Sequence, residues 1–195
     1  MFHSLVMSEK YRFYNPTGIY FVTETITGWI DVFTKKEYAT IILDSLDYCI
    51  KNKGLKVHAF VIMPSHLHLI LSSSGAPSLS EIIRDFKKYT SRAILQRITN
   101  SSESRKEWML LYFRQHAMQI KRSDQHKVWQ DGSHPIGLDS PVFYAQRLNY
   151  IHQNPVKARF VNEPHHFVFS SASAYANLPC PLQVHLLHQG MDEFL

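Results

Sequence analysis

The chain has 195 residues, a length suited to one domain with a single hydrophobic core and short for two domains. Hydrophobic residues make up 45% of it and charged residues 19%, which excludes a disordered or collagen-like protein. The formal net charge of +5 is compatible with a polyanionic partner, and two cysteines, Cys49 and Cys180, are too few for a disulfide framework. We expect one domain over residues 1–195, with an N-terminal extension at 1–10 and a C-terminal tail at 178–195.

Neither a membrane span nor an export signal is expected from the sequence. No apolar run approaches the roughly 18–20 residues that a membrane span requires. The first residues also lack a basic segment followed by a long apolar stretch, so a signal peptide is not expected. The sequence therefore predicts a cytoplasmic protein without a membrane partner.

The first elements are predicted to be a strand and a helix. Residues 18–27 (GIYFVTETIT) have the β-branched and aromatic composition of a strand. Residues 35–52 carry apolar side chains at helical spacing, and Gly54 then ends the helix. A strand followed by an amphipathic helix is the beginning of a mixed α and β domain.

Two further strands and a second helix follow. Residues 55–74 hold two apolar runs of strand length broken at Pro64 and Ser65, the pattern of an antiparallel pair joined by a tight turn. Residues 78–98 are predicted to be helical, since Ser78 and Glu81 form a capping-box pattern.

The order strand, helix, strand, strand, helix makes up most of a split βαβ unit. It predicts an α+β, ferredoxin-like (RRM-like) fold, in which an antiparallel sheet carries helices on one face. A fourth strand must close the sheet, and residues 126–130 (HKVWQ) are the nearest candidate. An extra helix is expected over residues 106–120, with four side chains packed inward: Trp108, Leu111, Tyr112 and Met118.

A well-marked helix lies near the end of the chain. Ser140 is a suitable N-cap, Pro141 occupies the first helical position, and the pattern runs to Asn154, where Pro155 is expected to end it. Its apolar stripe consists of Tyr144, Leu148 and Ile151. The tail over residues 178–188 alternates in polarity and suggests an edge strand or an arm, with apolar positions at Leu182, Val184 and Leu186.

His66 and His68 flank Leu67 in the second strand of the antiparallel pair. Side chains two positions apart share one face of a strand, about 6–7 Å apart, so the two imidazoles are well placed to bind one divalent metal ion. Leu67 then points to the opposite, buried face. The spacing alone fits two surface histidines equally well. The apolar runs on both sides place the pair in mid-sheet, where burial of two polar rings is unfavourable unless they have binding partners.

Tyr150 and Asn154 lie four residues apart on the late helix and share a face with Arg147. Each has an ordinary explanation, since a tyrosine beside an apolar stripe often only packs and an asparagine before proline often only ends a helix. Combined with the two histidines, they form a complete site for cutting nucleic acid. The histidines and the Asn154 carbonyl would bind Mg²⁺ or Mn²⁺, and the Tyr150 oxygen would attack phosphorus.

The segments PSHLHLIL and YIHQNPVKA resemble the HUH single-tyrosine transposases of the insertion-sequence type, particularly the REP-associated tyrosine transposases. The resemblance extends along nearly the whole chain, through IYFVT, FKKYTSRAI, VWQDGSHPI and FSSASAY. It implies a ferredoxin-like fold with an added C-terminal tyrosine-bearing helix. It also implies a bound divalent cation, and cleavage and transfer of single-stranded DNA from hairpins of palindromic repeats through a 5′-phosphotyrosine intermediate.

Residue by residue, the resemblance assigns His66 and His68 to the HUH pair, Tyr150 to the nucleophile and Asn154 to the third metal ligand. The chain departs from its relatives at Ser65, where they often carry Asn or Glu. That difference affects a hydrogen bond behind a ligand and leaves the ligands themselves in place.

Basic residues supply a predicted DNA-binding surface. Several lie on one side of the second helix or close behind it in sequence, with one more beside the tyrosine: Arg84, Lys87, Lys88, Arg92, Lys121, Arg122, Lys127 and Arg147. Trp129 and Tyr89 are candidates for stacking on unpaired bases. The alternative is a solvated charged face of a helix.

Two other functions remain open from the sequence. A non-catalytic protein that binds structured DNA or RNA through an RRM-like sheet would also be basic and ferredoxin-like. A metal phosphoesterase would use His66 and His68 without a covalent step. The sequence also leaves open the target repeat, the preferred cation, and the choice between a monomer and a homodimer with its site in cis or in trans.

Overall fold

The computed structural model describes residues 13–119 and 126–187. In chain order the elements are β1 (Tyr20–Thr25), η2 (Thr27–Trp29), η3 (Val32–Thr34), α1 (Lys36–Lys53), β2 (Leu55–Met63), β3 (His66–Ser73), α2 (Leu79–Asn100), α3 (Lys106–Gln119), β4 (Ile136–Gly137), α4 (Pro141–Lys157), η4 (Pro164–His166) and α5 (Ala172–Tyr175). Within these ranges, no helix is both long and apolar enough to cross a bilayer.

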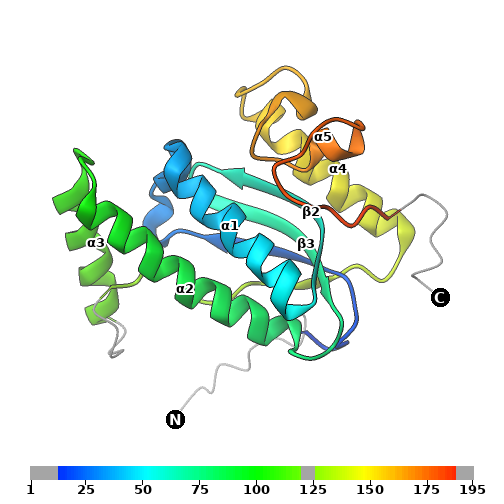
Figure 1. Cartoon of the computed structure of the whole chain (residues 1–195), viewed down its shortest axis with the longest axis horizontal. Helices are drawn as coiled ribbons and strands as arrows, with labels where there is room; N and C mark the ends of the chain where they lie inside the picture. Colours follow the sequence, from blue (N-terminus) through cyan, green and yellow to red (C-terminus); the bar gives the residue numbers. More distant parts are fainter. Residues whose placement is uncertain (1–12, 120–125, 188–195) are drawn as a thin grey trace, which may run out of the picture.

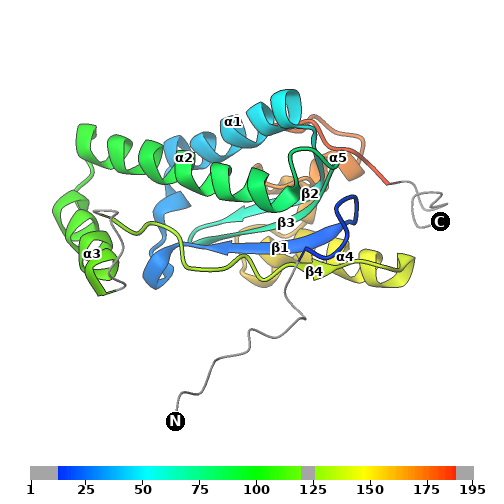
Figure 2. The same cartoon turned by 90° about the horizontal axis from the view of Figure 1, so that it is seen from below.

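The four strands form one antiparallel sheet in the order β2-β3-β1-β4. Helices α1 and α2 cover one face, and α4 lies against the other (Figures 1 and 2). In this order each helix joins two parallel strands that have a third strand between them, as in the ferredoxin-like unit. The predicted α+β fold is therefore confirmed, together with the added C-terminal helix.

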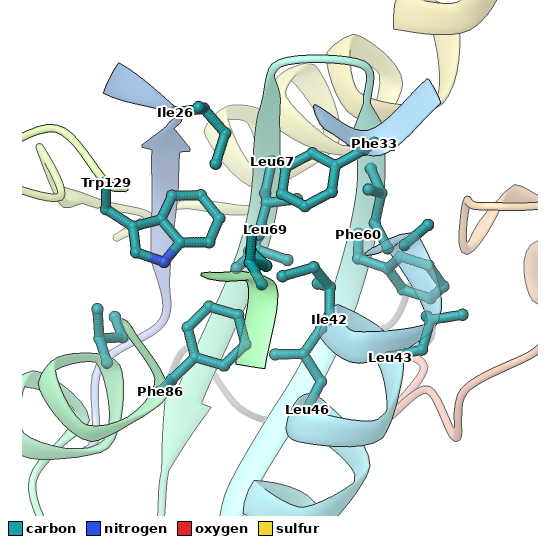
Figure 3. Packing of buried hydrophobic residues seen from close by; sticks show 14 of the residues in the cluster. Ile26, Phe33, Ile42, Leu43, Leu46, Phe60, Leu67, Leu69, Phe86 and Trp129 are labelled. Atoms are coloured by element: carbon teal, nitrogen blue, oxygen red, sulfur yellow. The ribbon is translucent and has the colours of Figure 1, made fainter. Parts of the chain in front are cut away.

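The sheet is covered on both faces, so every residue of β3 after His66 is buried. Leu67 and Leu69 point into the larger core between the sheet and the helices α1 and α2 (Figure 3), and Leu71 belongs to the same core. Ile70 points the other way, into a smaller core under α4 that includes Tyr144 and Ile151. Because side chains alternate along a strand, His66 and His68 share the α4 face with Ile70.

Local sequence signals set the boundaries of α1 and α2. Gly54 ends α1 with a left-handed φ of 66°, which glycine adopts without steric cost. The Ser78 side chain accepts a hydrogen bond from the Glu81 N–H, and the Glu81 carboxylate accepts one from the Ser78 N–H. The predicted capping box is therefore present.

The prediction of a fourth strand at residues 126–130 was wrong. Residues Ile136 and Gly137 form β4 and pair with β1, whereas the earlier segment makes a single bridge between Trp129 and Ile26. Trp129 is buried, with its ring pointing into the larger core (Figure 3), and its indole N–H donates to the Thr90 hydroxyl. The segment thus serves to plug the core and contributes little to the sheet.

The predicted inward face of α3 was also wrong. The helix buries Met109, Phe113 and Ala117, while three of the expected residues are exposed: Trp108, Leu111 and Met118. Tyr112 is only partly buried. Because α3 carries apolar side chains on two adjacent faces, its periodicity could not select the face that packs.

In the C-terminal part, the expected end of α4 was wrong, and the tail takes one of the two forms expected for it. Pro155 does not end α4: the helix continues to Lys157, with the proline ring buried. A proline removes one N–H group, and the apolar contacts of this ring offset that loss. Residues 178–187 form no strand. They run as an arm in which Leu182 is buried and the His185 N–H donates to the Val57 carbonyl of β2.

Candidate active site

His66 and His68 lie side by side on the α4 face of β3, with ring centroids 4.8 Å apart. Each ring is held by a hydroxyl group at its Nδ1 atom. The Thr23 Oγ1 lies 2.9 Å from Nδ1 of His68, and the Ser65 Oγ lies 3.2 Å from Nδ1 of His66. A hydrogen bond at Nδ1 fixes the orientation of an imidazole and directs Nε2 toward another ligand.

Both imidazoles are kept neutral. Burial lowers the pKa of His66 below its usual value. Burial lowers the pKa of His68 to about 3, helped by the repulsion that its protonated form would meet from a protonated His66 and from Arg147. A neutral imidazole carries the lone pair that a divalent metal ion requires, so the pair is suited to bind one.

Helix α4 brings Tyr150 to this pair. Its N-terminus is set by Ser140, whose hydroxyl accepts the Phe143 N–H. The Tyr150 hydroxyl lies 3.4 Å from Nε2 of His68, although the two residues are 82 positions apart. The tyrosine is 37% exposed, so its side chain is partly accessible from solvent. The structure therefore unites the predicted tyrosine and the predicted histidines.

The position of α4 is fixed by a second set of contacts that sequence reasoning missed. His152 lies two residues after the tyrosine, and its Nε2 is 2.9 Å from the Ser171 hydroxyl. Ser171 in turn accepts the Phe60 N–H from the edge of β2. Burial lowers the pKa of His152 to about 4, so this imidazole is neutral too. The signal was present in the HQNP and FSSASAY segments, but the contact between them is not visible from sequence.

Asn154 lies one turn beyond Tyr150 and is half-buried. Its side-chain amide has no hydrogen-bond partner among residues 13–119 and 126–187. Within those same ranges no group of three or more His, Cys, Asp or Glu residues could hold a metal ion. A third ligand supplied by the described residues would therefore be of another type, and an amide oxygen suits Mg²⁺ or Mn²⁺. The residues present fit such an ion.

A fixed positive charge stands beside the histidines. The Arg147 guanidinium lies 5.0 Å from the ring centroid of Phe21 and 5.3 Å from that of Phe143. Phe21 itself stacks on the His68 ring, with centroids 5.4 Å apart. Buried Arg147 Nε has no hydrogen-bond partner in the part of the chain that the structure describes. The guanidinium is therefore well placed to meet an anion.

The predicted basic residues of α2 line a groove of about 690 Å³ between that helix and residues 126–132. Lysines that line the groove are already paired: Lys87 with Glu24 at 2.6 Å, and Lys127 with Asp131 at 2.6 Å. Lys88, Arg92 and Tyr89 are exposed. Buried Trp129 is not available to stack on bases, contrary to the prediction. Two more predicted residues, Lys121 and Arg122, lie outside the described residues.

Three aromatic or hydroxyl side chains of the site were not foreseen. Thr23 and Phe21 are two apart on β1 and so share its α4 face, but only the pairing of Thr23 with His68 shows what they contact. Trp29 lies edge-on to His66, with ring centroids 5.4 Å apart. Register between strands and the course of a loop are tertiary properties, which the sequence alone did not reveal.

Comparisons with known proteins agree with this geometry. The family model described as "Transposase IS200 like" matches residues 29–128, just over half of the chain, a stretch that includes both histidines and ends before α4. The solved structure titled "Structure of the REP associates tyrosine transposase bound to a REP hairpin" is similar, with a TM-score of 0.61 and 19% sequence identity over 92% of each chain. Curated protein sequences give no significant match. The resemblance read from the motifs is thereby confirmed, and the chain belongs to the IS200-like family of HUH single-tyrosine transposases.

Proposed function

We propose that this transposase cuts and rejoins single-stranded DNA through a covalent bond to Tyr150, acting on hairpins formed by repeat DNA with the help of Mg²⁺ or Mn²⁺. The observation that carries the proposal is the 3.4 Å approach of the Tyr150 hydroxyl to His68 Nε2. A tyrosine that served only to pack α4 would bury its ring in the stripe of Tyr144 and Ile151, whereas this one is exposed beside the imidazoles.

The reaction is an exchange of one phosphodiester for another. The Tyr150 oxygen attacks phosphorus and the bond from phosphorus to the 3′ oxygen breaks. The 5′ phosphate of the DNA is then bonded to Tyr150 as a 5′-phosphotyrosine. The phenol proton passes to solvent, to which Tyr150 is partly exposed, and the departing 3′ oxygen takes up a proton. Rejoining is the reverse attack by a 3′-hydroxyl, so no nucleotide cofactor is required.

His66, His68 and Asn154 would hold the divalent cation, which when bound polarises a non-bridging phosphate oxygen. Thr23 and Ser65 support this role by orienting the two imidazoles. The charge of Arg147, beside His68, would bind the phosphate and favour the extra negative charge of the transition state.

A hairpin substrate is supported by the similar solved structure, which holds a REP hairpin. In this chain the groove along α2 offers Lys88 and Arg92 to the phosphates of such a stem. Helices α2 and α4 lie on opposite sides of the sheet (Figure 2). The groove is lined by α2 and the tyrosine belongs to α4, so bound DNA would pass around the edge of the sheet.

The test is a covalent adduct that survives a denaturing gel. Wild-type protein with single-stranded hairpin DNA and Mn²⁺ should form one, and chelation of the metal ion should prevent it. Tyr150→Phe should abolish the adduct while DNA affinity changes less than about twofold, because the variant lacks only one oxygen.

The matched control is Tyr48→Phe, which alters an exposed tyrosine of α1 outside the predicted DNA-binding residues and should leave adduct yield unchanged. Undiminished adduct from Tyr150→Phe would remove that residue from its role. Cleavage that persists in Tyr150→Phe without an adduct would indicate a phosphoesterase. Metal-independent binding with no cleavage of any repeat-derived hairpin would indicate a non-catalytic binding protein.

A further inference from the structure

Trp29 is an exposed indole beside the metal-binding histidines. The residue is 60% exposed, and its ring lies edge-on to His66 at a centroid distance of 5.4 Å. Its backbone adopts a left-handed φ of 58°, a conformation that is unfavourable for a bulky residue such as tryptophan. Neither the proposed chemistry nor the core accounts for a large ring held in this way.

The backbone under Trp29 is held in place by the turn that precedes His66. The Ile26 N–H donates to the Ser65 carbonyl, and the Phe33 N–H donates to the Pro64 carbonyl. Between these two anchors, the Trp29 N–H donates to the Ile26 carbonyl. The indole is therefore presented at a set position relative to the histidines.

Four rings make a continuous row across the site. Tyr150 contacts His68 at 5.1 Å, His68 contacts His66 at 4.8 Å, and His66 contacts Trp29 at 5.4 Å, all between ring centroids. Tyr150 and Trp29 stand at opposite ends. In an in-line displacement the attacking and leaving oxygens also stand on opposite sides of phosphorus.

The surroundings of Trp29 favour a nucleobase over an apolar protein partner. Its exposed neighbours in sequence are Gly28 and Asp31, and the Asp31 carboxylate is paired with Arg105 at 2.5 Å. The Tyr112 ring of α3 is partly buried and lies against Gly28, so the Trp29 indole is the exposed ring at this edge of the histidine pair. An exposed aromatic ring can stack on an unpaired base. An apolar protein interface would need a wider hydrophobic patch.

We propose that Trp29 stacks on the unpaired base of the nucleotide whose 3′ oxygen leaves when Tyr150 attacks. This inference rests on the proposed function and assigns the site a substrate-binding residue for the strand that departs. The stacked base would set the position of the sugar and of the scissile phosphate above the histidines.

The test measures which single base of the DNA depends on Trp29 for its contribution to binding. Hairpin oligonucleotides with an abasic site at each unpaired position in turn are titrated with Tyr150→Phe protein, which binds without cutting, alone and combined with Trp29→Asn. Asparagine tolerates the left-handed backbone, so the fold should persist. Removing the partner base should weaken binding of the Tyr150→Phe protein roughly 5- to 100-fold, and should have no further effect once Trp29→Asn is present.

The wild-type adduct maps the scissile bond separately, so absence of any adduct would count against the proposed function. The coupled base should be the one immediately 5′ of that bond, and Trp29→Phe should keep most of the affinity. Trp108→Ala, which alters an exposed tryptophan of α3, should show no coupling.

Coupling to a base on the 3′ side, or equal losses on all oligonucleotides, would overturn the inference. So would unchanged DNA binding accompanied by loss of self-association. Trp29→Gly, which suits the same φ, repeats the measurement if the asparagine variant melts earlier.

Discussion

A buried ion pair separates Lys87 from the other basic residues of α2. Its ammonium lies 2.6 Å from the Glu24 carboxylate, which is almost fully buried, and it also donates to the carbonyls of Gln130 and Gly132. Burial raises the pKa of Glu24, and the charge of Lys87 opposes that rise. Lys87 thus joins α2, β1 and the segment that follows α3.

We predict that Lys87→Met destabilises the protein by about 3–5 kcal/mol, because it leaves a buried carboxylate without its partner. Urea unfolding measures this. Lys88→Met, at the exposed neighbouring position, should change the free energy of unfolding by less than about 0.5 kcal/mol. It should instead weaken DNA binding. The slope of log affinity against log salt concentration should also become shallower by about the amount due to one phosphate contact. Equal stability of the two variants would refute the assignment.

Single residues show where reading the sequence succeeded and where it stopped. The alternation His66, Leu67, His68 was sufficient to place two imidazoles on one face and a leucine in the core, as the structure has them. Lys87 and Trp129 were placed on the surface because their neighbours are polar or basic. Their buried partners, Glu24 and the Thr90 hydroxyl, come from distant elements and could not be seen.

At the scale of elements, α4 is held to β2 by the link from His152 through Ser171 to Phe60. The folded state keeps His152 neutral, with a pKa of about 4, whereas the unfolded chain protonates near 6.5. The unfolded state therefore binds more protons between these pH values. This histidine makes the protein progressively less stable as the pH falls from about 6.5 to 4.

His152→Gln should flatten that dependence while keeping an amide near Ser171. We expect the pH-dependent loss of stability to shrink by up to about 3 kcal/mol at pH 4, the equivalent of the shift in pKa. Urea unfolding at pH 7, 5.5 and 4 checks it. The other buried histidines, His58 and His68, and the half-buried His66 are unchanged in both proteins, so the difference isolates His152. Parallel curves would show that the imidazole is not buried as described.

Element boundaries were predictable where a local rule operates. The Ser140 cap and the stripe of Tyr144 and Ile151 were recognised because capping and helical period are local properties. The end of α4 was not, because burial of the Pro155 ring is decided by the sheet beneath it. For the same reason, the packed face of α3 depends on α2 and the η2 region more than on its own sequence.

At the scale of the whole molecule, the outer edge of β2 is covered by the C-terminal segment. The Ile62 N–H donates to the Phe169 carbonyl, and the His185 N–H donates to the Val57 carbonyl. Leu182 anchors this arm in the core formed with α1 and α2. A covered edge protects a sheet from pairing with other chains.

Leu182→Ala should therefore weaken both the core and the cover of the edge. We expect a loss of about 2–5 kcal/mol in the free energy of unfolding, as for other buried leucines. Sedimentation at increasing protein concentration should also reveal self-association. Leu178→Ala is the matched control, since that leucine is 47% exposed and its loss should cost little. A Leu182→Ala protein as stable and as monomeric as the control would contradict the anchoring role.

The fold could be predicted because the order of its strands and helices could be predicted. Strand, helix, strand, strand and helix are each marked by composition, and few sheets accommodate that order. The site was predictable as two fragments, His66 with His68 and Tyr150 with Asn154. The approach of Tyr150 to His68 required the packing of α4 on the sheet, which no local pattern encodes.

The strand that carries the two imidazoles is also a strand of the core. Leu67, between them, is fully buried beneath α1 and α2. Inserting or deleting one residue in β3 would invert the strand, sending both imidazoles into hydrocarbon and leucines toward the tyrosine. The number of residues in β3 therefore cannot change by one without reversing which side chains face the core. Descendants of this sequence can lose or retune the pair by point substitution, but an insertion or deletion here would cost the fold and the chemistry together.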